Sequence, residues 1–194
     1  FGVKQRNKIL SKGENIHLLL LTATPIPRSL TMTNYGDLDL SVINETPKNR
    51  KSIITKVIPL ERYNEVITAI KRALKRNEKI YWICPLLEMS EKLDVVALLK
   101  RYEQLLKEFR EYHPVMAHGQ MTKEERENSI NSFFTNKSKI LVASTVIEVG
   151  IDIPDATIII IENSERFGLA QLHQLRGRVG RGSLQSYCIL MYNK

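Results

Sequence analysis

The chain has 194 residues, of which 43% are hydrophobic, 26% are charged and 7% are aromatic. This composition is typical of a globular protein with an ordinary core, and it excludes a disordered or disulfide-stapled chain. Lys and Arg outnumber Asp and Glu by 29 to 21, so the formal net charge is +8. The excess favours a polyanionic partner, although many domains carry such an excess for solubility alone.

The two cysteines, Cys84 and Cys188, lie in apolar runs, and neither has a second Cys or His at metal-ligand spacing. We therefore expect two buried free thiols and no metal site. The sequence contains no disulfide framework, no N-terminal apolar signal and no apolar run long enough to span a bilayer, which favours a cytoplasmic protein. Because the first residue is Phe1 and not Met, we expect a fragment.

Residues 1–46 are predicted to belong to a different lobe from the rest of the chain. The apolar run Leu18–Leu21 predicts a buried strand, and the two prolines of Thr22–Arg28 end it and favour a functional loop. A short helix is expected over Ser29–Tyr35. The polar stretch Asn44–Lys51 is typical of an exposed connection. We assign residues 47–60 to the connection and a first strand, and residues 61–194 to a second lobe.

In the second lobe, short β-rich runs alternate with apolar-periodic stretches of helical length, which is typical of βα units around a parallel sheet. Strands are predicted at Ile53–Pro59, Lys79–Cys84, Val115–Ala117, Lys139–Val142, Thr157–Ile161 and Tyr187–Tyr192. Helices are predicted at Tyr63–Arg76, from a cap at Ser90 to about Tyr112, from Thr122 onward, and at Leu169–Arg176. The fold class is therefore α/β.

The helical periods also predict which side chains are buried. In the helix after Ser90, the residues near a 3.6-residue period are Leu93, Val96, Leu99, Leu105, Leu106 and Phe109. Thr122 and Glu125 have the spacing of a capping box, and the helix that they start is expected to bury Ile130, Phe133 and Phe134. The first helix carries a basic face of Lys71, Arg72, Lys75 and Arg76.

Polar clusters follow three of the predicted strands, at His118–Gln120, Ser144–Thr145 and Asn163–Glu165. Parallel α/β sheets place their binding loops at the carboxyl ends of the strands, so we expect the chemistry to lie along that edge. Hydroxyls and backbone amides at Ser144 and Thr145 can hold a nucleic-acid phosphate, although helix capping explains them equally well. His118 is expected to contact backbone in its loop.

The segment Gln174–Gly182 places Arg176, Arg178 and Arg181 at a helix end, with glycines between them. A planar, permanently charged guanidinium suits the neutralisation of charge on a transferring phosphoryl group, which makes Arg178 and Arg181 candidates for that role. The alternative is a basic helix end that stabilises the helix macrodipole.

Val149–Pro154 follows a predicted strand and a polar turn. Its Asp152 can accept a hydrogen bond from a ribose hydroxyl, and Gly150 permits close backbone approach, although a turn explains both residues equally well. Thr22, Thr24 and Arg28 form a further polar loop of the kind that links nucleotide state to strand grip, or that merely ends a strand.

Three ordered segments resemble motifs III, V and VI of superfamily 2 helicases. They are Thr22–Thr24, Val142–Pro154 and Gln174–Arg181. The extended forms Thr22–Arg28 and Leu172–Gly182 resemble the RecG branch of that superfamily, which also includes the transcription-repair coupling factor. Within the branch, the segments Tyr35–Ile43, Tyr81–Pro85 and Ile147–Asp152 are similar to the RecG type more than to the coupling factor.

The resemblance implies a RecA-like parallel sheet flanked by helices, in the C-terminal lobe of an ATP-dependent double-strand DNA translocase. Such motors remodel stalled replication forks and Holliday junctions. The resemblance further implies arginine fingers at Arg178 and Arg181, a place near the γ-phosphate for Gln174, and nucleotide contacts at Gly150 and Asp152. The residues implied to contact nucleic acid or to couple hydrolysis to motion are Thr22, Thr24, Arg28, His118, Gly119, Ser144 and Thr145.

The sequence contains neither a Gly-x-x-x-x-Gly-Lys-Ser/Thr loop nor an acidic Asp-Glu box for magnesium. We therefore expect ATP with magnesium to be bound mainly by a preceding motor lobe, and this chain alone to hydrolyse no ATP. The family's wedge domain is expected to recognise branched double-stranded DNA. A second hypothesis is a non-enzymatic nucleic-acid-binding module, in which the basic face of the first helix dominates.

Overall fold

The computed structural model describes residues 11–13, 19, 21, 41–43, 45, 50–85, 91–144, 153 and 155–193, with side chains in the helix from residue 91 described from Val95 on. The chain divides into two compact units, Phe1–Glu45 and Thr46–Lys194. The division lies one residue from the boundary expected from the sequence. That the first unit is the end of another motor lobe stays a prediction.

In the first unit, the predicted strand at Leu18–Leu21 is not formed at its two described residues. Leu19 and Leu21 are 80% and 86% exposed and belong to no strand. The expectation of a buried strand is wrong at these positions, because an apolar strand needs neighbouring strands or a helix to bury its side chains. The loop Thr22–Arg28 and the helix expected after it lie outside the described residues.

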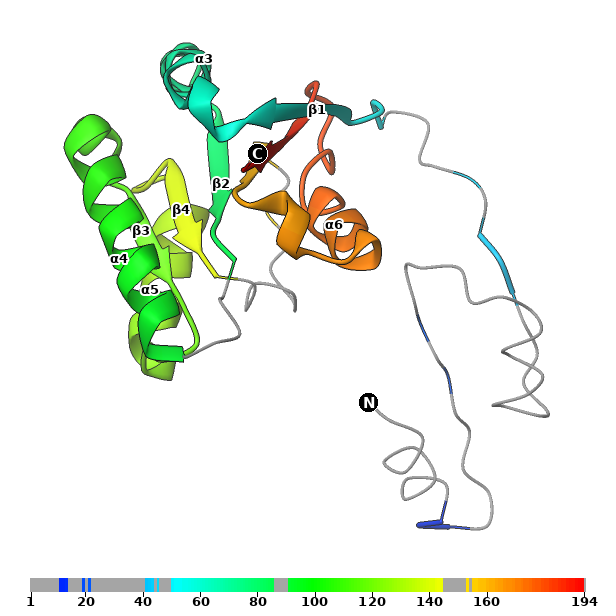
Figure 1. Cartoon of the computed structure of the whole chain (residues 1–194). Coiled ribbons are helices and arrows are strands. Elements are labelled where there is room, and N and C mark those ends of the chain that lie inside the picture. Colours follow the sequence, from blue (N-terminus) through cyan, green and yellow to red (C-terminus); the bar gives the residue numbers. More distant parts are fainter. Residues whose placement is uncertain are drawn as a thin grey trace. The chain divides into compact units, whose positions relative to one another are not determined.

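The second unit is built on a six-stranded sheet of order β1-β6-β5-β2-β4-β3, in which all neighbouring strands pair in parallel (Figure 1). The strands are β1 (Ile54–Pro59), β2 (Lys79–Ile83), β3 (Val115–Ala117), β4 (Ile140–Ala143), β5 (Ala156–Ile161) and β6 (Tyr187–Tyr192). Each end lies within one residue of its predicted position.

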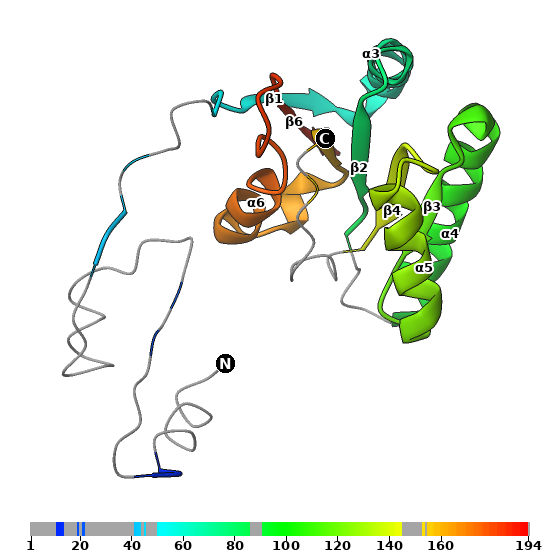
Figure 2. The same ribbon diagram turned by 180° about the vertical axis from the view of Figure 1, so that it is seen from behind.

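In the part of the chain that the structure describes, four helices cover the two faces of the sheet. They are α3 (Tyr63–Lys75), α4 (Glu91–Glu108), α5 (Lys123–Phe134) and α6 (Leu169–Arg176), with 3-10 turns η1 (Leu60–Arg62), η2 (Arg110–Tyr112) and η4 (Ser164–Arg166). Figures 1 and 2 show α4 and α5 on opposite sides of β3 and β4. The predicted α/β fold class is confirmed.

Alternating side chains of the strands build two separate cores. Trp82 of β2 packs in one cluster with residues of α3 and α4, whereas its neighbour Tyr81 packs in the other with residues of α5 and α6. Successive side chains of a strand point to opposite faces, so a sheet that is covered on both faces must be apolar at nearly every position. This explains why every residue of β5 is buried and why all of them except Thr157 are apolar.

Fewer side chains of α4 and α5 are buried than the helical periods predicted. Leu98, Leu105 and Phe109 of the α4 region are buried, as is Phe133 of α5. The predicted burial of Val96, Leu99, Leu106 and Phe134 is wrong, because these side chains are 60%, 38%, 38% and 58% exposed. One residue turns the side chain by about 100° around the helix axis, so a neighbour of a buried residue leaves the face that touches the sheet.

A capping box starts α5, as predicted. The backbone N–H of Glu125 donates to Thr122 Oγ1 at 3.3 Å, and the backbone N–H of Thr122 donates to Glu125 Oε2 at 2.9 Å. The helix then carries Phe133 into the core, where its ring centroid lies 5.1 Å from that of Tyr81. The local signal and the packing therefore agree on where this helix begins.

A buried ion pair joins α4 to the end of β5. Arg101 Nε lies 2.6 Å from Oε1 of Glu162, and Trp82 Nε1 donates to the same oxygen at 2.6 Å. The Arg101 guanidinium also lies 4.7 Å from the Tyr63 ring centroid. Burial raises the pKa of the Glu162 carboxyl, and the ion pair with Arg101 and the hydrogen bond from Trp82 only partly oppose that increase.

The capping box predicts how much stability is lost when the Thr122 hydroxyl is removed. Thr122→Ala should lower the free energy of unfolding by about 1 kcal/mol, because the N–H of Glu125 loses its acceptor. Thr68→Ala, at an exposed position inside α3, is the matched control and should be neutral or slightly stabilising, because Ala has the higher helix propensity. Urea unfolding of both variants measures the difference, and equal losses would contradict the assignment of the cap.

The raised pKa of Glu162 predicts a pH dependence of stability. A carboxyl whose pKa is higher in the folded state binds a proton on folding, so it stabilises the fold at low pH. Relative to Glu162→Gln, the wild-type chain should therefore lose stability as the pH rises from the ordinary glutamate range through the folded pKa.

The measurement is urea unfolding of both chains at several pH values, followed by the fluorescence of Trp82, the single tryptophan. Glu103→Gln, on an exposed position of α4, removes the same charge without burial and serves as the control. A wild-type chain that gains stability over Glu162→Gln as the pH rises would show that the ion pair outweighs the burial.

Candidate functional site

Residues that directly follow four neighbouring strands form a row at the carboxyl edge, the edge where the strands end. These residues are Glu162, Cys84, Ser144 and His118, after β5, β2, β4 and β3. Backbone hydrogen bonds extend the sheet into this row: Glu162 N–H donates to Ile83 O at 2.9 Å, Cys84 N–H to Ala143 O at 2.9 Å, and Ser144 N–H to Ala117 O at 3.3 Å. His118 and Ser144 therefore both lie at the carboxyl edge, as expected, and the structure adds that they follow adjacent strands.

His118 is buried and shapes the turn that follows β3. Its Nδ1 accepts a hydrogen bond from the backbone N–H of Gln120 at 3.3 Å, which confirms the expected backbone contact. Burial lowers the pKa of His118, and the nearby carboxylate of Glu125 only partly opposes this. The ring is therefore neutral at pH 7 and carries its proton on Nε2. The following Gly119 and Gln120 are exposed and accessible to a ligand.

Ser144 is fully buried, and its hydroxyl has no hydrogen-bond partner among the described residues. A hydroxyl in that position does not reach solvent, so burial gives no support to direct contact with a nucleic-acid phosphate. Its role stays a prediction. The other candidate residues with no described structure are Thr22, Thr24, Arg28, Thr145, Gly150 and Asp152.

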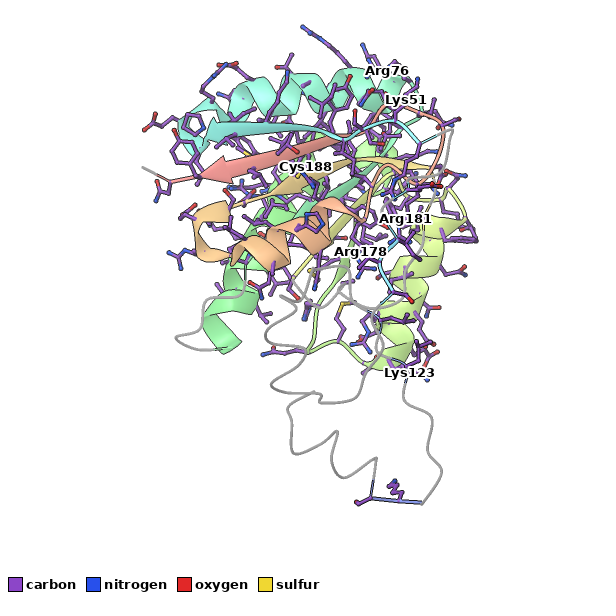
Figure 3. All side chains as sticks on the ribbon, turned by 90° about the vertical axis from the view of Figure 1, so that its right-hand side faces the viewer. Lys51, Arg76, Lys123, Arg178, Arg181 and Cys188 are labelled. Carbon is purple, nitrogen blue, oxygen red and sulfur yellow. The ribbon has the colours of Figure 1, made fainter. Side chains whose placement is uncertain are left out.

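The arginine segment lies at the opposite edge, the amino edge, where the strands begin. A Cβ atom on Gly180 would lie 2.8 Å from Cγ1 of Ile53, which precedes β1, and 3.7 Å from Cβ of Ser186, which precedes β6. Figure 3 shows Arg178 and Arg181 on the side from which β1 and β6 start. The expectation that all the chemistry lies along the carboxyl edge is therefore wrong for this segment.

The physical reason is the direction of the crossover helix. A helix that connects two parallel strands runs back from the carboxyl edge to the amino edge. The residues after its last turn therefore emerge where the next strand begins. Sequence spacing placed the arginines at a helix end, but only the packing of α6 against the sheet shows to which edge that end belongs.

The turn after α6 holds its arginines on a fixed backbone. Gly177 N–H donates to His173 O at 3.1 Å and Arg178 N–H donates to Leu175 O at 3.0 Å. Val179 is fully buried, so the turn is anchored in the core between the half-buried Arg178 and the exposed Arg181. Arg181 Nε donates to Gly177 O at 3.3 Å. Two guanidinium groups on one anchored turn are suited to binding phosphate oxygens.

Gln174 lies on the exposed surface of the last turn of α6, two residues before the end of that helix. The structure thus brings Gln174, Arg178 and Arg181 together on one helix end and its turn. It does not bring them together with His118, Gly119 or Ser144, which belong to the other edge.

Lys79 is a buried cation at the amino edge that the sequence did not reveal. Its Nζ donates to Phe134 O at 3.0 Å and lies 2.9 Å from Oδ2 of Asp155. Asp155 immediately precedes β5, so the pair anchors the entry into that strand. A lysine at the start of a strand is usually solvated, and no sequence signal distinguishes this one.

The basic face of α3 is partly neutralised. Lys71 forms an ion pair with Glu108, and Arg76 Nε lies 2.8 Å from Oε1 of Glu78. Only Arg72 and Lys75 of the four cations have no ion pair described in the structure, which weakens the hypothesis that this face dominates binding of nucleic acid.

No helix among the described residues is long and apolar enough to cross a membrane.

The contact of Gly180 with Ile53 predicts that position 180 does not tolerate a side chain larger than that of glycine. Gly180 has a φ of +74°, so an added Cβ both strains the backbone and overlaps the Ile53 side chain. Gly180→Ala should lower the free energy of unfolding by about 2 kcal/mol. At Gly168 an added Cβ meets only Gln171 Oε1 at 3.8 Å, and Gly168→Ala should change stability by less than about 1 kcal/mol. Thermal unfolding of the pair tests this, and equal stabilities would refute it.

Residues 61–183 match the family model of the helicase conserved C-terminal domain. The RecG helicase of Thermotoga maritima is 47% identical over 192 residues, which are 98% of this chain and 25% of that protein. The RecG helicase of Bacillus subtilis is 45% identical over 192 residues, with 98% of this chain and 28% of the relative covered. The chain thus spans about a quarter of the length of these curated relatives.

Among solved structures, RecG bound to a three-way DNA junction matches with a TM-score of 0.74 and 43% identity, over 89% of this chain and 22% of that one. Dbp5 of S. cerevisiae, bound to RNA and ADP BeF3, matches with a TM-score of 0.59 over 86% of this chain and 42% of that one. At 18% identity, the second match supports only the RecA-like fold. The chain belongs to the family of helicase conserved C-terminal domains and is similar to the corresponding part of RecG helicases over nearly its whole length.

Proposed function

We propose that this chain is the second motor lobe of a RecG-type, ATP-dependent DNA helicase. The observation that carries the proposal is the anchored turn after α6, which presents Arg178 and Arg181 at the amino edge. The whole motor translocates on double-stranded DNA and remodels branched DNA, such as stalled forks and Holliday junctions. The high identity to RecG helicases favours this assignment over the transcription-repair coupling factor.

In the proposed mechanism, Arg178 and Arg181 neutralise the charge that develops on the transferring phosphoryl group of ATP, and Gln174 lies near the γ-phosphate. Arginine is suited to this role because its charge is permanent and its donors form a planar fork. ATP supplies the free energy for movement. Gly150 and Asp152 are proposed to contact the nucleotide.

We assign magnesium to the preceding motor lobe and to the phosphates of the nucleotide. The described residues of this chain contain no group of three His, Cys, Asp or Glu side chains placed to hold a metal ion. An arginine pair contributes charge without metal ligands, so this lobe is suited to complete a phosphate site that another lobe begins.

The two edges of the sheet suit two coupled tasks. His118, Gly119, Ser144 and Thr145 are proposed to lie along the nucleic-acid path at the carboxyl edge, whereas the arginines face the nucleotide at the amino edge. A strand of six residues, such as β5, separates the edges by roughly 20 Å of packed core. Closure of the lobe on ATP would therefore move the grip on DNA as a rigid body, with Thr22, Thr24 and Arg28 coupling hydrolysis to that motion.

The cysteines suit a cytoplasmic location, which we include in the proposal. Cys84 and Cys188 are both free and buried. Burial raises the pKa of Cys188 to about 11 and that of Cys84 well above its ordinary value. Neither side chain is therefore a reactive thiolate at pH 7, and both are compatible with a reducing compartment.

The proposal predicts the effect of the two arginines in a helicase that includes the preceding motor lobe and wedge domain. Arg178→Ala or Arg181→Ala should lower DNA-stimulated ATP turnover by roughly three orders of magnitude, because the transition state loses a neutralising charge. Arg72→Ala removes a cation from the exposed surface of α3 and should leave turnover near normal. Steady-state phosphate release measures all three, and near-normal turnover in both arginine variants of the turn would disprove the assignment.

A further inference from the structure

A groove of about 450 Å³ lies at the amino edge, beside the arginine turn. Its lining consists of Arg50, Lys51, Ser52, Ile53, His173, Arg176 and Gly177. Three of these side chains are cations, and none is a carboxylate. Figure 3 shows Lys51 on the same side of the second unit as Arg178 and Arg181. The lining cations have no role in the proposed mechanism above.

Two segments that are distant in sequence build this groove. The segment before β1 is fixed by a hydrogen bond from Gln185 Nε2 to Ser52 O at 2.8 Å, and by one from Ile54 N–H to Ser186 O at 3.0 Å. Ile53 then packs against Gly180. Because the backbone next to Lys51 is tethered in this way, the positive charges before β1 are held opposite the end of α6.

The other wall of the groove is a pair of side chains one helical turn apart. Arg176 Nη2 lies 3.1 Å from His173 Nδ1. A guanidinium only donates hydrogen bonds, so Nδ1 must accept and the neutral imidazole carries its proton on Nε2. All four long polar side chains of the lining, Arg50, Lys51, His173 and Arg176, are therefore hydrogen-bond donors.

The electrostatic balance favours an anion in the groove. The C-terminal end of α6 contributes the equivalent of about half a negative charge, which alone would repel an anion. The three cations of the described lining outweigh it, and none of the described lining residues is a carboxylate that would compete with a ligand for them. Among the described lining residues, His173 has the only ring that could stack on a base, whereas three cations are suited to phosphate oxygens, so the chemistry favours phosphate over a nucleobase.

We propose that this groove binds a phosphate group, either of a polyphosphate or of a nucleic-acid backbone. The assignment of phosphate follows from charge and geometry, whereas the choice between nucleotide and DNA as its source rests on the proposed function. The groove adjoins the arginine turn at Gly177, the residue that precedes Arg178.

The test measures binding of inorganic tripolyphosphate and of a short blunt DNA duplex to the 194-residue chain. Arg50→Gln/Lys51→Gln removes two charges from the groove, and Arg176→Gln removes one from its other wall. Arg72→Gln/Lys75→Gln removes two charges from the exposed surface of α3 and is the matched control. Circular dichroism and thermal unfolding establish that each variant is folded.

We expect the groove double variant to bind its ligand about tenfold more weakly than the wild-type chain. For DNA, the slope of log affinity against log salt should also fall by about two. Arg176→Gln should weaken binding of the same ligand, and the α3 control variant should bind that ligand as tightly as the wild-type chain does. If the groove variants lose affinity for tripolyphosphate alone, the phosphate in the groove belongs to a nucleotide. If they lose affinity for DNA alone, it belongs to the nucleic-acid backbone, and if they lose affinity for both ligands, the groove is a general phosphate site.

Equal losses in the groove variant and the α3 control would overturn the proposal, because net charge alone would then explain binding. Unchanged affinity of the groove variants for both ligands would overturn it as well. Failure of the motor assignment is separable, because it is read from ATP turnover of the Arg178→Ala and Arg181→Ala helicases and leaves these binding measurements intact.

Discussion

Parallel pairing of all six strands is the constraint on which the rest of this fold depends. Each connection must cross from the end of one strand to the beginning of the next, so strand ends and helix ends are sorted to opposite edges. His118 and Ser144, which directly follow β3 and β4, share the carboxyl edge, while the turn after α6 meets the starts of β1 and β6. A lobe built in this way has two separate surfaces joined by a rigid core.

Each edge is reinforced by an ion pair with a buried member, Lys79 at the amino edge and Glu162 at the carboxyl edge. Lys79 and Asp155 join the beginnings of β2 and β5, and Arg101 and Glu162 join α4 to the end of β5. Charges in such places are costly to bury, as the raised pKa of Glu162 indicates. Their hydrogen bonds to Phe134 O and from Trp82 offset part of that cost and require one particular packing of helix on sheet.

The positive side chains of the chain differ in whether a carboxylate neutralises them. Two cations on the basic face of α3 are neutralised by Glu108 and Glu78, whereas the described lining of the groove at the amino edge contains three cations and no carboxylate. The arginine turn lies beside that groove. The groove proposed to attract a phosphate therefore adjoins the turn for which the family resemblance implies contact with the nucleotide.

Local pattern by itself determined the six strands of the second unit to within one residue, the bounds of α6 and the capping box of Thr122, because backbone periodicity and capping are short-range effects. The resemblance carried by the arginine and glycine spacing led to the helicase family. Only the tertiary structure decided that Val96 and Phe134 are exposed, that Lys79 is buried, and that Arg178 lies at the amino edge. Those properties depend on which neighbour a helix face or strand end meets, and residues distant in sequence supply that neighbour.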